Sequence, residues 1–584
     1  MRRHMNRGLA VVAALALVPL AGCVSLPSEG PIVESDASGQ GAQSDAMNIN
    51  PRGPQPGQSA VEVVKGWLDA MQATPIRTTV AREFLSQSAR DTWAPTETIT
   101  YAAASQPSAA SGQLVTVTLT GADSLDDRGA WRGPLGEAES TLEIPMVRED
   151  GEWRINDPED ALIVPESWFE QRFRQVSLYF FDPTARVLVP DPVFVPRGRQ
   201  LASALVDGLL AGPAPALAAY ALSAVPTDLR AAVSVPVSAD GVADIELTGN
   251  SGDVAALTGE GAELMINQLA WTLRQDPSIE RLRVSIGGTP VEVAGQTEFS
   301  VDQGDRYAPY VADASTLLYG LEDGLVVGGS AQSLDPVTGP FGEQAYGLRS
   351  VSLDMPAEQA AGVSSDGTSL LVGPVGTEGS GVEQLLSGAT DLLDPAWDFS
   401  GRLWIVDRRE DGARVKFTQG GRMRSLKVPG ISGRDVRLML VSRDGSRLVA
   451  VVRGRRDDTI LVSRLLSDGR GDVVGALPAV EVSEPGGRSL RIRDIAWRSP
   501  TSIVVLHEVS DHLFQVRAAT VDGAPNRLEG LSLTLDGRII ALAGTPTPDV
   551  SVYAVTRGSL IDLAGASAGT IAIDPDVTSL GYVG

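Results

Sequence analysis

Apolar residues recur at helical spacing at the start of the first patterned region of the chain. Four of them lie three or four positions apart and predict one buried helix face: Val61, Val64, Leu68 and Met71. Ser59 and Glu62 have the spacing of a capping box, so this helix is expected to begin at Ser59. A second helix is expected over 78–92.

Beyond these helices, the period of the apolar positions changes to two. Segments 114–119, 141–147 and 153–155 alternate in this way, as strands with one buried face do. Two helices followed by a small antiparallel sheet predict an α+β domain over 59–175, an arrangement that resembles the cone-shaped NTF2-like domains. Its tryptophans either line a pocket or belong to the core, and aromatic residues at such spacings are more often core: Trp67, Trp93, Trp131 and Trp153.

A second α+β domain is expected over 176–300. Its expected elements are a buried strand at 176–181, a helix at 201–211, strands at 231–235 and 242–247, a helix at 261–275 and a strand at 282–286. Gly212 and Pro213 end the first helix, and Asp240-Gly241 supplies the turn between the two middle strands.

Short sequences in this second domain resemble the GerMN domain of sporulation and spore germination proteins. They are Leu-Tyr-Phe at 178–180, Leu-Leu-Ala-Gly-Pro at 209–213, Ser-Ala-Val-Pro at 223–226, Ile-Glu-Leu at 245–247, Trp-Thr-Leu at 271–273 and Val-Ser-Ile at 284–286. The resemblance implies a module for interactions with other molecules.

From 301 onward, short alternating segments and Gly-rich turns replace helical periodicity. One sequence motif recurs at 363–372, 440–450 and 533–541, with looser copies at 397–405 and 496–504. The turn residue falls at 367, 401, 445, 500 and 537, with gaps of 34, 44, 55 and 37 residues. This spacing predicts one four-stranded blade per repeat, and thus a β-propeller of about six or seven blades over 301–584. A sandwich of many strands is the alternative.

The N-terminal segment has the features of a lipoprotein signal. An apolar run at 9–20 follows Arg2, Arg3 and Arg7, which is typical of an export signal over 1–22, and the run is shorter than the roughly 20 residues of a membrane span. Leu-Ala-Gly-Cys at 20–23 resembles the lipobox of bacterial lipoproteins. The resemblance implies that Cys23, the only cysteine, becomes an S-diacylglycerol and N-acyl cysteine carrying fatty acids such as palmitate. The alternative is an ordinary secretory signal with a chance cysteine.

The composition of the rest of the chain indicates where the protein is expected to be located and which class of partner is not expected. Residues 23–58 are rich in Ser, Gly, Pro and Gln and predict a disordered, lipid-anchored tether. The formal net charge is −25, and it becomes −28 when the arginines of the signal are removed, so nucleic acid is not an expected partner. Because no later segment has the length and apolarity of a membrane span, the lipid is the expected anchor, at the extracytoplasmic face of the cell membrane.

Candidate catalytic groups are few. His507 and His512 have no cysteine near them and are expected to have core or surface roles rather than to bind a metal. Ser567 lies in a Gly-x-Ser-x-Gly pattern, but no histidine follows it to complete a hydrolase triad. Gly376–Gly381 lacks the spacing of a dinucleotide loop. The sequence therefore predicts no catalytic, cofactor-binding or metal-ligating residue, and a protein that is not an enzyme.

The order of lipobox, α+β domain, GerMN-like domain and propeller resembles the LpqB family of actinobacterial lipoproteins. The resemblance implies an accessory protein of the MtrA–MtrB two-component system that contacts the extracytoplasmic domain of the sensor kinase MtrB. It would thereby affect cell-wall homeostasis and division. The alternative from another class is a binder of cell-wall glycan or peptide, or a hydrolase, that uses the propeller face.

Overall fold

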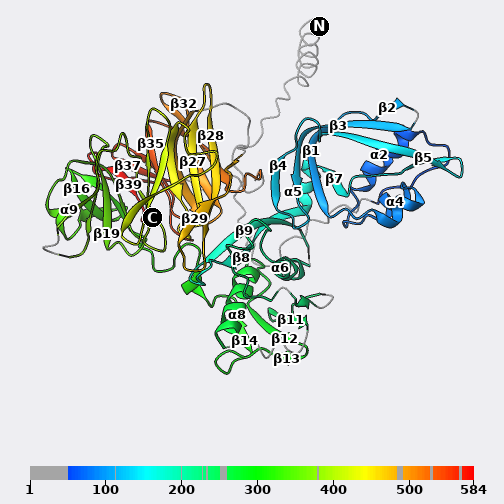
Figure 1. The fold of residues 1–584 in the computed structure, drawn as a ribbon, viewed down its shortest axis with the longest axis horizontal. Helices are drawn as coiled ribbons and strands as arrows, with labels where there is room; N and C mark the ends of the chain where they lie inside the picture. Colours follow the sequence, from blue (N-terminus) through cyan, green and yellow to red (C-terminus); the bar gives the residue numbers. More distant parts are fainter. Residues whose placement is uncertain are drawn as a thin grey trace, which may run out of the picture. The chain divides into compact units, whose positions relative to one another are not determined.

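The computed structural model describes residues 50–584, apart from 112, 199, 227, 232–233, 250–258, 378–380, 483–490, 526–530 and 564–568 (Figure 1). The expected signal over 1–22, Cys23 and the tether up to residue 49 lie outside the described residues. Two domains that combine helices with strands precede a third built almost entirely of strands, so the predicted fold class is confirmed.

The N-terminal domain packs helices against one curved sheet. Its helices are α2 (Ala60–Ala70), α3 (Thr79–Glu83), α4 (Gln87–Thr92) and α5 (Glu166–Arg172). Its strands are β1 (Glu97–Ala104), β2 (Ser108–Ser111), β3 (Leu114–Leu125), β4 (Trp131–Pro134), β5 (Thr141–Glu149), β6 (Glu152–Ile155) and β7 (Ala161–Pro165). The sheet order is β6-β5-β3-β1-β7, with β2 and β4 also paired to β3.

The first helix begins where the sequence predicts. Ser59 is its N-cap, and the reciprocal hydrogen bonds with Glu62 form the predicted capping box. The expected single helix over 78–92 is wrong, because the chain breaks into α3 and α4. At the break, the Ser86 backbone N–H donates to the Ile155 carbonyl at 2.7 Å, while the Ser86 hydroxyl caps α4. Pairing with the end of β6 therefore replaces a helical turn.

The second domain packs two helices against short sheets. Its elements are β8 (Phe173–Phe181), β9 (Leu188–Pro196), α6 (Leu201–Leu210), β10 (Arg230–Ala231), β11 (Val242–Thr248), α8 (Gly259–Leu273), β12 (Arg281–Ile286), β13 (Thr289–Pro290), β14 (Glu298–Ser300) and the 3₁₀ helix η1 (Asp305–Tyr307). Strands β8 and β9 form a hairpin, and β11 pairs parallel to β12. Of the strand expected at 231–235, β10 includes only Ala231, and 232–233 lie outside the described residues. Beyond residue 300, the Tyr307 ring still packs on Phe181, with ring centroids 5.1 Å apart.

The third domain is a propeller with six blades among the described residues. The blades are β39-β15-β16-β17, β18-β19-β20-β21, β22-β23-β24-β25, β26-β27-β28-β29, β31-β32-β33-β34 and β35-β36-β37-β38, each written from the inner strand outward.

The strand bounds of blades one to three are β39 (Thr578–Gly581), β15 (Leu318–Glu322), β16 (Leu325–Ser330), β17 (Ser333–Pro336), β18 (Leu348–Leu353), β19 (Gln359–Ser364), β20 (Leu370–Pro374), β21 (Glu383–Leu386), β22 (Ala396–Trp397), β23 (Leu403–Asp407), β24 (Arg414–Gln419) and β25 (Arg422–Leu426). A short helix, α9 (Pro340–Glu343), follows β17.

The bounds of blades four to six are β26 (Val436–Val441), β27 (Arg447–Arg453), β28 (Asp458–Ser467), β29 (Val473–Ala476), β31 (Arg491–Ser499), β32 (Ser502–Ser510), β33 (Leu513–Thr520), β34 (Ser532–Asp536), β35 (Ile539–Ala543), β36 (Tyr553–Thr556), β37 (Ser559–Asp562) and β38 (Thr570–Ala572). Strand β30 (Val480–Glu481) adds a further pairing to β28.

The propeller is held together by apolar layers between neighbouring blades. Each buried cluster draws on consecutive sheets: Val449 and Val451 of blade four pack with Ile503 and Val505 of blade five. Leu318 of blade one packs with Leu560 of blade six, which closes the ring, and β39 pairs with β15 across the same closure. Among the described strands, each inner strand pairs with one neighbour only, so its free edge faces the channel, where the ring protects it from other chains.

The recurring sequence motif lies in turns between strands, but it does not occupy the same position in each blade. Gly401, Gly445 and Pro500 lie in turns between the first and second strands of their blades, whereas Gly367 lies between the second and third strands of blade two. Gly537 lies in the connection between two blades. The turn itself is the same: the Ser364 hydroxyl donates to Asp366 at 2.6 Å, and Ser442 does the same to Asp444. A local sequence specifies this turn wherever two strands must be joined.

Candidate functional site: the propeller channel and the domain joint

The residues considered as sites from the sequence lie apart. Cys23 and Ser567 fall outside the described residues, as does part of 376–381. His507 is buried on β32 and His512 is exposed in the turn that follows. Within the described ranges, no group of three His, Cys, Asp or Glu side chains is placed to hold a metal. None of the described helices is long and apolar enough to cross a bilayer.

The four tryptophans of the N-terminal domain do not line one pocket. Trp67 and Trp93 are buried, with ring centroids 6.1 Å apart. Trp131 instead packs near Phe194 of the second domain, and Trp153 lies under the Arg148 guanidinium, 4.6 Å from its ring centroid. The four indoles therefore make three different contacts, and only the Trp67–Trp93 contact belongs to the core.

The propeller contacts the second domain through the turns that follow its inner strands, and this contact is called the joint. In blade four this turn brings Arg447 to the β8–β9 hairpin, where its Nη2 donates to the Pro190 carbonyl. The Arg447 side chain is only 1% exposed, and its Nη1 lies 3.8 Å from Asp444. Burial lowers the pKa of Arg447 to about 9, so the guanidinium still carries its charge at neutral pH.

A single carboxylate joins all three domains at this joint. Asp191 on β9 accepts from Arg464 of the propeller at 2.8 Å and lies 3.5 Å from Arg128 of the N-terminal domain. Arg128 also donates to the Gly212 carbonyl at 2.8 Å. The three side chains are between 10% and 19% exposed, so solvent screens these pairs less than it screens a surface ion pair.

A second arginine ties the joint to the closure of the ring. Arg443 is buried, and its guanidinium donates to the carbonyls of Tyr310 at 3.1 Å and Val583 at 2.9 Å and to the Thr547 hydroxyl at 2.9 Å. Backbone carbonyls accept most of these N–H groups, which offsets the desolvation of the charge.

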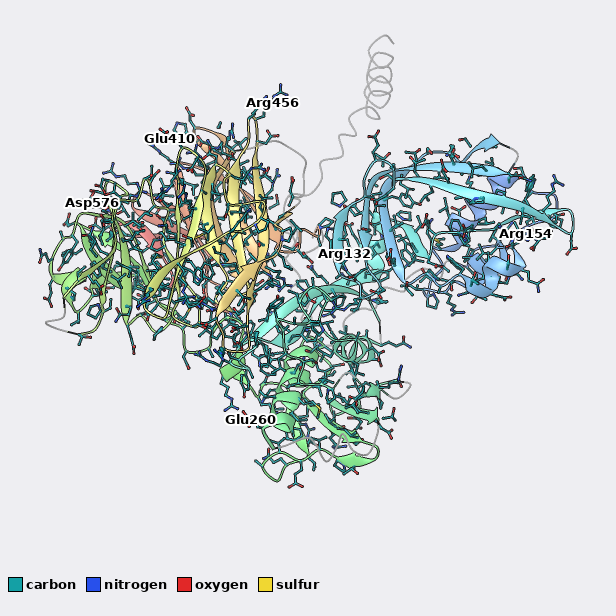
Figure 2. The ribbon with its side chains drawn as sticks, in the orientation of Figure 1. Arg132, Arg154, Glu260, Glu410, Arg456 and Asp576 are labelled. Atoms are coloured by element: carbon teal, nitrogen blue, oxygen red, sulfur yellow. The ribbon has the colours of Figure 1, made fainter. Side chains whose placement is uncertain are left out.

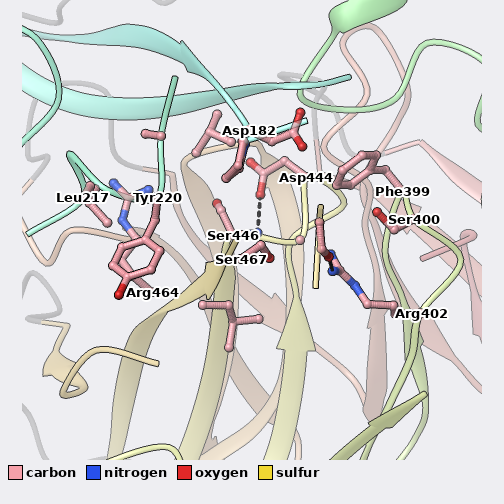
Figure 3. Close-up of a pocket in the computed structure, with 16 residues that line it drawn as sticks. Asp182, Leu217, Tyr220, Phe399, Ser400, Arg402, Asp444, Ser446, Arg464 and Ser467 are labelled. Carbon is pink, nitrogen blue, oxygen red and sulfur yellow. Dashed lines mark hydrogen bonds between the residues drawn. The ribbon is translucent and has the colours of Figure 1, made fainter. Parts of the chain in front are cut away.

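A small cavity remains in the joint (Figure 3). It measures about 50 Å³ and lies between Tyr220 and Leu217 of the second domain and Phe399, Arg402 and Asp444 of the propeller. In Figure 3, Asp444 accepts from the Ser446 backbone N–H, at 2.8 Å. A cavity of this size holds water or a methyl-sized group. This cavity is too small for a substrate, but two more open hollows of about 430 Å³ each lie elsewhere between the second domain and the propeller, one beside Tyr179 and Pro500 and one beside Arg186 and Phe399.

The larger hollow is the channel enclosed by the inner strands. Its volume is about 440 Å³, and propeller residues alone line it. They come from the whole length of the inner strands, from Arg437 near the start of β26 to Leu440 near its end. Because the turns after the C-terminal ends of these strands form the joint, Arg437 of β26 and Asp494 of β31 lie toward the other end. That end also holds the turns between second and third strands, where Glu410 and Arg456 extend outward (Figure 2).

Two guanidiniums that line this channel, those of Arg349 and Arg408, share one carboxylate. Asp391 accepts from Arg349 at 2.6 Å and from Arg408, and both donors use Nη2. Partial burial disfavours the charged form of Asp391, but the two arginines outweigh this and lower its pKa. The group of three therefore carries a net charge of one positive unit. Arg437 has a partner of its own, Asp435, at 2.8 Å.

Two further carboxyl groups line the channel. Asp494 accepts from the backbone N–H groups of Ile495 at 2.9 Å and Leu542 at 2.7 Å, so it links blades five and six. Burial raises the pKa of Asp494 to about 7, with a smaller contribution from the charge of Asp394. Asp394 itself is exposed.

Sequence reasoning missed all of these residues. Arg349, Asp391 and Arg408 belong to different strands and loops of blades two and three, and no spacing between them is diagnostic. Arginine at an inner strand gave no signal either, because the inner strands also carry Arg437, Arg491, Arg493 and Arg498.

Comparisons with known proteins match all three domains. A model of the "Lipoprotein LpqB, N-terminal domain" matches residues 53–170, one for "Sporulation and spore germination" matches 177–292, and one for the "Lipoprotein LpqB beta-propeller domain" matches 324–565. Lipoprotein LpqB of Streptomyces coelicolor is 26% identical over 562 residues, which is 90% of this chain and 89% of that protein. Lipoprotein LpqB of Cutibacterium acnes is 27% identical over 520 residues, which is 86% of each.

Likeness to solved structures is weaker. The first GerMN domain of the sporulation protein GerM from Bacillus subtilis covers 22% of this chain and 97% of its own, at 20% identity and a TM-score of 0.18. Scores of this size do not establish a shared fold. The family models and the full-length relatives agree, however, in domain identity and order: the chain belongs to the LpqB family of lipoproteins, which are extracytoplasmic and membrane-anchored.

Proposed function

We propose that this lipoprotein is a non-enzymatic accessory protein that binds the extracytoplasmic domain of the sensor kinase MtrB and modulates the MtrA–MtrB phosphorelay. Cell-wall homeostasis and division would respond through that relay. The observation that carries the proposal is that the joint uses one end of the propeller, while propeller residues alone line the channel along the inner strands, which leaves the other end of the propeller free of the described residues of the second domain. A large, preformed protein surface is thus available to a macromolecular partner.

The proposed lipid at Cys23 supports the same function. Anchoring confines the protein and the kinase to one membrane surface, which raises the effective concentration of each for the other. Two or more acyl chains at about 0.8 kcal/mol per buried methylene make such anchoring stable. A modest intrinsic affinity for the kinase domain is then sufficient.

The test uses the purified lipidated protein and full-length MtrB in phospholipid vesicles. Added lipoprotein is expected to change the rate of phosphotransfer to MtrA, and its soluble form should co-precipitate with the MtrB extracytoplasmic domain. The matched control is Cys23→Ala, which should keep domain binding in solution but lose most of its effect on vesicles. Phosphotransfer that is indifferent to the lipidated protein would overturn the proposal.

The second candidate is binding or hydrolysis of cell-wall glycan or peptide, because Asp394 and Asp494 both line the channel and their environments differ. Paired carboxyl groups in different environments are typical of glycosidases. However, both oxygens of Asp494 already accept backbone N–H groups of the channel wall. Incubation with isolated peptidoglycan distinguishes the candidates: retention of the protein or release of fragments would favour the cell wall over the kinase.

A further inference from the structure

Two arginines that line the propeller channel, Arg349 and Arg408, share the carboxylate of Asp391. Both reach it through Nη2, and the Arg349 Nη2 also donates to the Leu392 carbonyl. The Arg408 Nε is buried, so the Nη1 groups in the two planar forks are the donors for a second carboxylate beside the first. The side chains are 34% and 27% exposed, which leaves them in reach of a ligand yet partly shielded from water.

The surroundings favour an extended, partly apolar ligand. Leu393, Leu438 and Leu440 line the same channel and are only partly buried. A volume of about 440 Å³ accommodates a few residues of peptide. The site is unusual for this protein, because a chain with a net charge of −25 repels anions over most of its surface.

We propose that the channel is a carboxylate-binding site that takes an acidic peptide segment of a partner, with the Arg349–Arg408 pair as its anion-binding group. A ligand carboxylate accepts hydrogen bonds from the spare guanidinium N–H groups while Asp391 keeps the pair in place. Arg437, on the adjacent inner strand, adds positive charge that is only partly offset by exposed Asp435. Asp394 opposes the ligand because it is an exposed carboxylate lining the same channel.

The occupant is an acidic segment of a protein partner, which the channel arginines recognise through its carboxylates.

Fluorescently labelled tetraglutamate is the probe, with tetraglutamine and tetralysine as matched controls. Fluorescence anisotropy with the full mature lipoprotein in detergent is expected to show binding of tetraglutamate at least ten times tighter than that of either control. The binding should weaken as sodium chloride rises, since salt screens the exposed guanidiniums. Equal binding of tetraglutamate and tetraglutamine would overturn the proposal.

The site is located by variants that are expected to change the affinity for tetraglutamate in opposite directions. Arg349→Gln should weaken tetraglutamate binding about ten-fold, and Arg437→Gln, whose ion-pair partner Asp435 is exposed, should weaken it about three-fold without affecting folding. Asp394→Asn should strengthen binding two- to three-fold, because it removes a like charge. Unchanged affinity in both arginine variants, or weaker binding in Asp394→Asn, would show that the channel does not bind carboxylates.

Discussion

Arg447 and Arg437 belong to the same blade and lie at its opposite ends. Arg447, at the joint, is 1% exposed and donates to a backbone carbonyl of another domain. Arg437, in the channel, is 38% exposed and pairs with a surface aspartate two residues away. Burial makes the first arginine part of the structure, because leaving its charge without a partner costs several kcal/mol. The second is stabilised by water whether or not its partner is present, so it remains available to a ligand.

The sharpest test of this comparison is the same substitution at both ends. Arg447→Gln should lower the apparent free energy of unfolding by about 3 kcal/mol, because Pro190 and Asp444 lose a buried partner. Urea unfolding followed by tryptophan fluorescence measures the change. A loss below about 1 kcal/mol would contradict the view that the joint depends on this guanidinium.

Asp191→Asn should have the next largest effect at the joint, about 2 kcal/mol, since it removes the shared partner of Arg464 and Arg128. A double-mutant cycle with Arg464→Gln separates this pair from the rest of the joint. If the two substitutions are additive, Asp191 does not couple the domains through Arg464.

Asp494 in the channel makes the stability of the folded protein depend on pH. Its raised pKa means that, between about pH 4 and 7, the folded protein still holds a proton that the unfolded chain has already released. Stability from this group is therefore fully present below about pH 4 and is lost as pH rises to about 7, and the loss between pH 5 and pH 8 is about 3 kcal/mol. Unfolding of the protein and of Asp494→Asn, measured at pH 5 and pH 8, should show that the difference between them changes by this amount. A constant difference would contradict the assignment.

The smallest effect on stability is expected for Arg437→Gln, within about 0.5 kcal/mol, because exposed ion pairs contribute little. This variant is also the control for Arg447→Gln in the urea experiment. A large loss would mean that the channel arginines are structural after all, and that the comparison between the two ends of the blade fails.

The sequence predicted elements well where local interactions decide them. The capping box at Ser59 and Glu62 forms as expected, and the Ser-x-Asp-Gly motif makes the same hydrogen-bonded turn at Ser364 and at Ser442. The position of this motif within a blade could not be read from the sequence, because the same kind of turn joins strands at both ends of a blade. The helix expected over 78–92 failed for a similar reason: Ser86 finds a backbone partner in Ile155, about seventy residues away.

What the sequence determined by itself is the order and class of the domains, because periodicity, caps and turns depend on residues a few positions apart. Only the tertiary structure decided which charges are buried and which remain accessible. Arg349, Asp391 and Arg408 come together because blades two and three close around one axis, and Asp191 meets Arg464 because a hairpin packs on a propeller turn. Such contacts join residues far apart in the chain, and burial, which sets the energy of a charge, arises only when they form.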